Sequence, residues 1–269
     1  MTSAALTTAR TTPARAVDPT DIRDVQRHAR VAGILYLVTF AASIPALLLL
    51  GPVLNDAVYI TGSGSDTRVL WACLLDVVNA VACVGTAVAL FPVVRRRNES
   101  LALGFVTSRM FEAAVIMVGV VSLVAVVTLR QDLAGQPGTD AASLTTVGRA
   151  LVEVRNWTFL FGPGFVPAIN AVLLGTLLYR SGLVPRVIPT IGLIGAPLLV
   201  GAAIATVFGA IDHGGPASQL MALPIAAWEL SADLDDGQGV SARGRRAARV
   251  TGRVPTAWTG RGSSRLRGE

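Results

Sequence analysis

The chain has 269 residues, of which 52% are hydrophobic and 15% charged, and its formal net charge is +6. A soluble domain of this size carries roughly 25% charged residues, and here the hydrophobic surplus lies in blocks, so the composition excludes an ordinary soluble domain. The basic balance fits contact with anionic lipid head groups. Because no folded basic module accompanies it, we expect no nucleic-acid partner.

The chain opens with a polar, arginine-containing segment, and residues 1–16 are predicted to be a disordered arm. Asp18, Pro19 and Asp21 are typical of a helix start, with a capping residue, a proline in the first turn and an acid near the positive dipole end. We expect this short helix to follow the membrane surface and lead into the first span. The apolar stretch begins too far from Met1, and is too long, for a cleavable signal peptide.

Apolar runs separated by short polar breaks fill residues 17–231, which we predict to be one transmembrane helical domain. A helix needs about 20 mostly apolar residues to cross a bilayer. Five runs reach this length: residues 31–51, 69–94, 101–129, 157–179 and 187–211. A sixth begins near Ala217 and stops after Leu230, too soon to span. The predicted fold class is all-α, a polytopic transmembrane bundle with five clear spans and a truncated sixth.

The longest polar break, residues 130–156, contains a turn at Gly135-Gln136-Pro137-Gly138. After this turn, apolar residues recur at helical spacing. They are Leu144, Val147, Leu151 and Val154. We expect a short amphipathic helix that lies on the outer membrane interface and connects two spans.

Arginines gather in alternate breaks, and this pattern predicts the orientation of the chain. They lie in the N-terminal arm, at Arg95, Arg96 and Arg97, and at Arg180 and Arg186. Basic loops stay in the cytoplasm, so both termini are predicted to be cytoplasmic. We expect a multi-pass protein of the bacterial inner (plasma) membrane, with the lipid bilayer as its partner. The sequence gives no prediction of the oligomeric state.

Four segments of the chain have a recognisable pattern. They are Arg30-Val31-Ala32-Gly33-Ile34-Leu35-Tyr36-Leu37, Ser108-Arg109-Met110-Phe111-Glu112, Val184-Pro185-Arg186 and Pro224-Ile225-Ala226-Ala227-Trp228-Glu229-Leu230. Together they resemble an uncharacterised bacterial membrane family, catalogued as domain of unknown function 4386. The resemblance covers about Arg30 to Leu230 and implies six spans. It implies no activity, because the family has none assigned.

The chain departs from the family pattern after Ser231, where the resemblance implies a further apolar stretch and a Trp-x-x-x-Lys-Gly-Phe ending. The genetic code allows a set of codons for residues 234–240 that encodes Trp-Met-Thr-Val-Lys-Gly when the reading frame starts one nucleotide later. We therefore hypothesise that a single-base shift replaced the end of the sixth helix and made residues 232–269 a disordered, out-of-frame basic tail. The alternative is a genuine disordered cytoplasmic tail. The coding DNA decides between them, since the offset frame must encode the apolar ending.

Charged and amide side chains inside the apolar runs are the candidate site, because each charge costs about 2.5–3.5 kcal/mol on insertion into a bilayer. These residues are Asp76, Asn79, Arg109, Glu112, Asn170 and Glu229. In one interpretation they line a polar cavity that binds or moves a small molecule or ion. In the other they are the buried polar network of a non-enzymatic scaffold or subunit, in which Arg109 pairs with Glu112 or with Asp76 and the bonds fix helix packing.

An enzyme is the less favoured class, because the sequence contains no nucleophile elbow and offers only carboxylates as acid–base groups. His28 and His213 are predicted to lie on opposite sides of the membrane, so they cannot share a metal ion. We expect no cofactor and no metal. Gly162-Pro163-Gly164 and Pro167 predict an interruption of the fourth span, either a proline kink or the broken helix of a binding site.

Overall fold

The computed structural model describes residues 19–62, 64–181, 184–212 and 214–231. The predicted arm at 1–16 and the predicted tail at 232–269 lie outside these residues. The described residues form helices and no strands, which confirms the all-α prediction.

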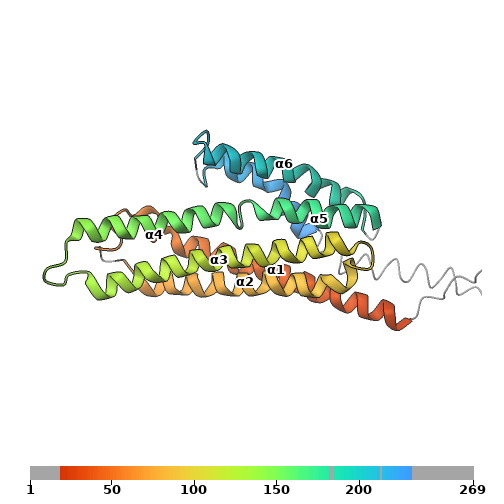
Figure 1. The fold of residues 1–269 in the computed structure, drawn as a ribbon, viewed down its shortest axis with the longest axis horizontal. Helices are drawn as coiled ribbons and strands as arrows, with labels where there is room; N and C mark the ends of the chain where they lie inside the picture. Colours follow the sequence, from red (N-terminus) through yellow and green to blue (C-terminus); the bar gives the residue numbers. More distant parts are fainter. Residues whose placement is uncertain (1–18, 63, 182–183, 213, 232–269) are drawn as a thin grey trace, which may run out of the picture.

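Seven helical segments make up the described chain. They are α1 (Pro19–Asn55), α2 (Asp66–Val94), α3 (Glu99–Leu133), α4 (Ala141–Phe161), α5 (Val166–Ser181), α6 (Val187–Val207) and an unlabelled helix over residues 216–231. Figure 1 shows α1 to α5 running along the long axis, with α4 and α5 end to end. In the same view α6 and the 216–231 helix lie together beside α5.

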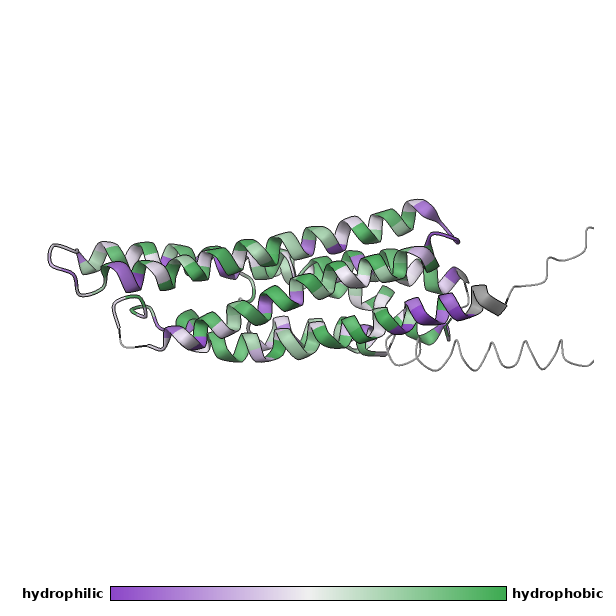
Figure 2. Ribbon diagram, turned by 90° about the horizontal axis from the view of Figure 1, so that it is seen from below, coloured by the Kyte–Doolittle hydropathy of each residue, from purple (hydrophilic) through white to green (hydrophobic). Residues whose placement is uncertain are grey.

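Five helical stretches are long and apolar enough to cross a membrane, as predicted, with α4 and α5 counted as one stretch from Ala141 to Arg180. The outside of the bundle is apolar. Leu48, Val81 and Val121 are each more than 60% exposed, and apolar residues cover the helices between polar ends in Figure 2. Only lipid makes such an exterior favourable, so this is a multi-pass membrane protein.

Two elements differ in extent from the sequence-based prediction. The expected surface helix and first span form one continuous helix, α1, of 37 residues. The helix predicted after the 135–138 turn is present as α4, but it packs along α3 and continues toward α5 instead of leaving the bundle as a separate interfacial connector. The turn itself is confirmed, because Gly135 and Gly138 adopt positive φ angles of 77° and 89°.

The arginine-rich connections lie at one end of the bundle. The start of α1, the turn between α2 and α3, and the junction between α5 and α6 all lie at this end in Figure 1, and the α1–α2 and α3–α4 loops lie at the other. At that second end Arg130 forms an ion pair with Asp66, donates a hydrogen bond of 2.8 Å to the Gly62 carbonyl, and lies 4.9 Å from the Tyr59 ring centroid. Burial raises the pKa of Tyr59, and the nearby Asp66 carboxylate raises it further. These contacts fasten the α1–α2 loop to the end of α3.

Two apolar clusters fill the interior, one toward each end. The cluster at the arginine-rich end contains Phe105 and Trp228, and the other contains Leu50 and Leu123. Along α3 the first cluster reaches Phe105 and the second begins at Ala113. The intervening helical turns carry charged side chains, so a polar layer separates the two clusters.

The 216–231 helix packs on α6 through glycines. Trp228 is 1% exposed and lies so close to Gly192 that a Cβ there would come within 2.6 Å of Trp228 Cδ2. Gly195, one turn along α6, leaves similar room for Pro224 and Ile225. Small residues that admit a neighbouring helix are typical of packing between membrane helices.

Candidate functional site

Glu112 on α3 is the centre of the first buried polar group. Its Oε2 atom accepts a hydrogen bond of 2.9 Å from Arg109 Nη1, one helical turn away, and one of 3.1 Å from Asn170 Nδ2 on α5. These three side chains are almost fully buried. The Arg109 guanidinium also lies 4.4 Å from the Tyr36 ring centroid on α1. In a desolvated setting such a cation–π contact is worth about 2 kcal/mol.

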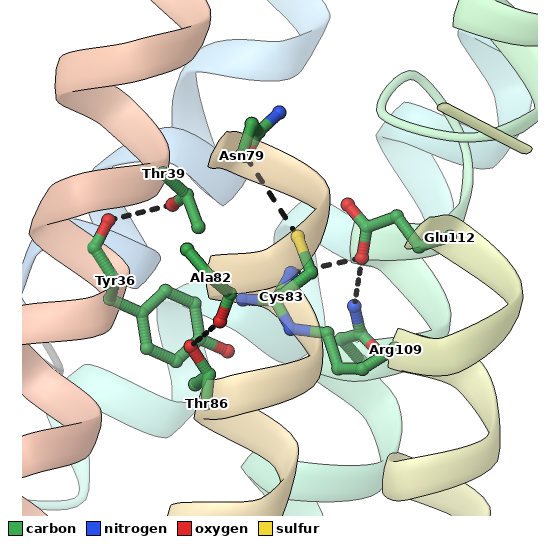
Figure 3. Close-up of polar contacts among 9 residues, drawn as sticks. Tyr36, Thr39, Asn79, Ala82, Cys83, Thr86, Arg109 and Glu112 are labelled. Carbon is green, nitrogen blue, oxygen red and sulfur yellow. Dashed lines mark hydrogen bonds and ion pairs between the residues drawn. The ribbon is translucent and has the colours of Figure 1, made fainter. Parts of the chain in front are cut away.

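Asn79 and Cys83 on α2 face the same group, as Figure 3 shows together with Tyr36, Arg109 and Glu112. The Cys83 thiol donates to Asn79 Oδ1 at 3.9 Å. The polar layer therefore draws side chains from α1, α2, α3 and α5, and its members are held mainly by one another.

Asp76 on α2 belongs to a second polar group. Its Oδ2 atom lies 3.5 Å from Nη2 of Arg155 on α4, and both side chains are buried. The Arg155 guanidinium also stacks 4.8 Å from the Phe159 ring centroid. Of the two partners considered for Arg109, the structure selects Glu112, and the counter-ion of Asp76 is Arg155.

Arg155 is the site residue that sequence reasoning missed, because it was assigned to the polar break at 130–156. Its signal was present in the spacing. The first three buried residues of α4 are Leu144, Gly148 and Arg155, and the successive spacings of four and seven residues place them on one helix face. Gly119 on α3 admits this side chain, since a Cβ there would lie 3.0 Å from Arg155 Cδ and 2.8 Å from Thr158 Oγ1.

The fourth span is interrupted as predicted, and the interruption borders a cavity. Residues 162–165 form turns between α4 and α5. Beside them a cavity of about 730 Å³ opens between α1, the α4–α5 break, α6 and the 216–231 helix. Apolar side chains dominate its wall. The polar side chains on the wall are Asn55, Arg155, Asn156, Ser218, Gln219 and Glu229.

Glu229 and Arg155 are the ionisable groups on this wall. The Oε1 atom of Glu229 is buried, and no described residue forms a hydrogen bond or ion pair with this carboxylate. Arg109 attracts the Glu229 carboxylate and Glu112 repels it, although neither is bonded to it. A second, small cavity of about 30 Å³ lies against Asp76, Asn79 and Arg155.

The six predicted site residues therefore form separate groups. Arg109, Glu112 and Asn170 are bonded together, and Asn79 accepts a hydrogen bond from Cys83. Asp76 lies with Arg155, and Glu229 lines the large cavity. Neither of the two cavities described above is lined by Arg109, Glu112 or Asn170.

Comparison with known proteins gives one match. Residues 31–233, three quarters of the chain, match the family described as a domain of unknown function, DUF4386. The chain belongs to the DUF4386 family. This confirms the resemblance stated from the sequence segments. No curated protein and no solved structure matches this DUF4386 chain, so the candidate site is argued from its own residues.

Proposed function

We propose that this DUF4386 protein binds a small, largely apolar molecule in the cavity between α1, the α4–α5 break, α6 and the 216–231 helix. The observation that carries the proposal is the cavity itself, with a volume of about 730 Å³ and two ionisable side chains on an otherwise mostly apolar wall. Ligand sites of drug-sized molecules span roughly 300–1,000 Å³ and combine apolar walls with a few polar groups in this way.

The helix break supports the same proposal. Pro163, Gly164 and Pro167 line the cavity, and discontinuous membrane helices commonly border binding sites. The proposal includes a bacterial plasma membrane as the location. It also includes both termini on the cytoplasmic side, because the arginine-rich connections share one end of the bundle.

A structural role is favoured for Arg109, Glu112 and Asn170. They are 2%, 4% and 0% exposed, and the hydrogen bonds from Arg109 and Asn170 to Glu112 join them to one another. Arg109 Nε and Nη2 and Asn170 Oδ1 form no hydrogen bond with the described residues. The scaffold interpretation therefore applies to this group, whose bonds fix the register of α3 and α5, and the binding interpretation applies to the cavity.

A cavity-filling pair of variants tests the proposal. Ala226 lines the cavity, and the next residue, Ala227, is exposed and does not. The protein in nanodiscs would be screened by thermal unfolding against small amphiphilic compounds. A ligand present at 100 times its Kd should stabilise the protein by about 2.7 kcal/mol. We expect Ala226→Phe to abolish the shift and Ala227→Phe to preserve it.

Two results would count against cavity binding. One is that no compound stabilises the wild-type protein. The other is that both variants respond as the wild type does, since the compounds would then be acting through the bilayer.

A further inference from the structure

We infer that the cavity ligand carries an organic ammonium group and that Glu229 is its counter-ion. This inference rests on the proposed function and specifies the chemical class of the ligand. It starts from the balance of charge around the cavity.

The interior charges do not cancel. Among the described residues, the charged side chains that are buried among the helices or line the cavity are two arginines, Arg109 and Arg155, and three carboxylates, Asp76, Glu112 and Glu229. Arg109 is bonded to Glu112, and Arg155 is paired with Asp76. Glu229 remains without a bonded cation among the described residues. A charge in this low-dielectric setting is stable only when it is paired or neutralised, and a cationic ligand would supply the missing partner.

An anionic ligand is disfavoured by the same contacts. The other ionisable group on the wall, Arg155, has Asp76 within 3.5 Å and stacks on Phe159. An anion would compete with Asp76 for that guanidinium and would be repelled by Glu229.

The α4–α5 break adds a hydrogen-bond acceptor, the Pro163 carbonyl. In a continuous helix the Pro163 carbonyl would accept from residue 167, but Pro167 has no N–H, and both prolines line the cavity. The cavity borders both the carboxyl end of α4 and the amino end of α5, whose partial charges are opposite, so the helix dipoles favour neither sign of ligand charge. The Pro163 carbonyl accepts no hydrogen bond from the described residues, and it favours an ammonium, whose N–H groups donate.

The size and lining of the cavity favour an organic cation over a bare metal ion. A space of about 730 Å³ with a mostly apolar wall would leave an inorganic ion with few oxygen ligands. A molecule with an apolar body and an ammonium group would occupy the apolar space and contact Glu229 at the same time.

Three probes that share one apolar body test the inference on the full chain in nanodiscs. They are 4-phenylbutylamine, 4-phenylbutanol and 4-phenylbutyrate, with binding measured in wild type, Glu229→Gln and the control Glu99→Gln. Glu99 is an exposed carboxylate at the start of α3, away from the cavity. We expect the amine to bind wild type and the control about tenfold more tightly than the alcohol does, which is 1.4 kcal/mol. Glu229→Gln should remove that preference, and the butyrate should bind most weakly.

Equal binding of amine and alcohol to wild type, no binding of the amine, tighter binding of the butyrate, or a preference that survives Glu229→Gln would each overturn the inference. A stabilisation by sodium or potassium chloride alone that depends on Glu229 would assign the carboxylate to an inorganic cation and overturn the organic ligand. When one of these overturning results is obtained but Ala226→Phe still removes the binding of neutral compounds, the cavity proposal stands and only the charge inference fails.

Discussion

Asp76 on α2 and Arg155 on α4 form a buried ion pair with 3.5 Å between Oδ2 and Nη2. The pair joins two helices that are far apart in the sequence, and Arg155 extends from it to the wall of the larger cavity. It is therefore both a packing contact between helices and a boundary of the proposed binding site.

Arg155→Gln should destabilise the protein by about 3 kcal/mol, because it leaves the Asp76 carboxylate buried without its cation. Thermal unfolding in detergent measures the loss. Arg149→Gln, at an exposed position on the same helix, should have little effect. Adding Asp76→Asn to Arg155→Gln should restore part of the stability. If the double variant is as unstable as the sum of the two single ones, the residues are not coupled.

Arg109→Leu should lower the yield and the thermal stability in detergent, since it strands Glu112 between the two apolar clusters. Met110→Leu is the matched control, because Met110 is 55% exposed on the next position of α3. Unchanged thermal unfolding of Arg109→Leu would contradict a buried pair.

Gly192→Ala should destabilise the packing of the 216–231 helix on α6, since the new methyl group would meet the Trp228 ring at 2.6 Å. Overpacking of this kind costs about 1–3 kcal/mol. Gly201→Ala lies on the same helix with nothing within 4 Å of the added Cβ and should be neutral or slightly stabilising. Equal melting temperatures of the two variants would show that Trp228 does not pack against Gly192.

The first turn of α4 should open at low pH. Asp140 caps this helix, and hydrogen bonds from the Ser143 hydroxyl, then from the Ser143 and Ala142 backbone N–H groups, lower the pKa of its carboxyl. Because the folded pKa is below the unfolded one, the stabilisation is present above the unfolded pKa and is lost as pH falls through the folded pKa. Hydrogen exchange in residues 141–145 should therefore speed up, relative to the intrinsic rate, in that acidic range.

Asp140→Asn separates the cap from its charge. Asparagine still accepts the capping hydrogen bonds but does not titrate there, so this variant should keep α4 closed across the same range. An identical pH response in Asp140→Asn and the wild type would show that another group controls the end of the helix.

The sequence by itself determined the class of this protein and the extent of most of its helices. Runs of about 20 apolar residues are stable as helices in lipid whatever their neighbours are, so the five spans and the break at Gly162-Pro163-Gly164 could be predicted from local composition. The pairing of Arg109 with Glu112 was also accessible, because residues three apart share a helix face.

The tertiary structure alone decided which polar residues meet across helices. The Asp76–Arg155 pair depends on α4 lying against α3, where Gly119 leaves space for the arginine, and no pattern within α2 specifies that approach. The position of Glu229 on the cavity wall likewise depends on Trp228 docking at Gly192. Contacts between distant segments follow from how side-chain volumes fit when helices pack, and this fit is a property of the whole bundle.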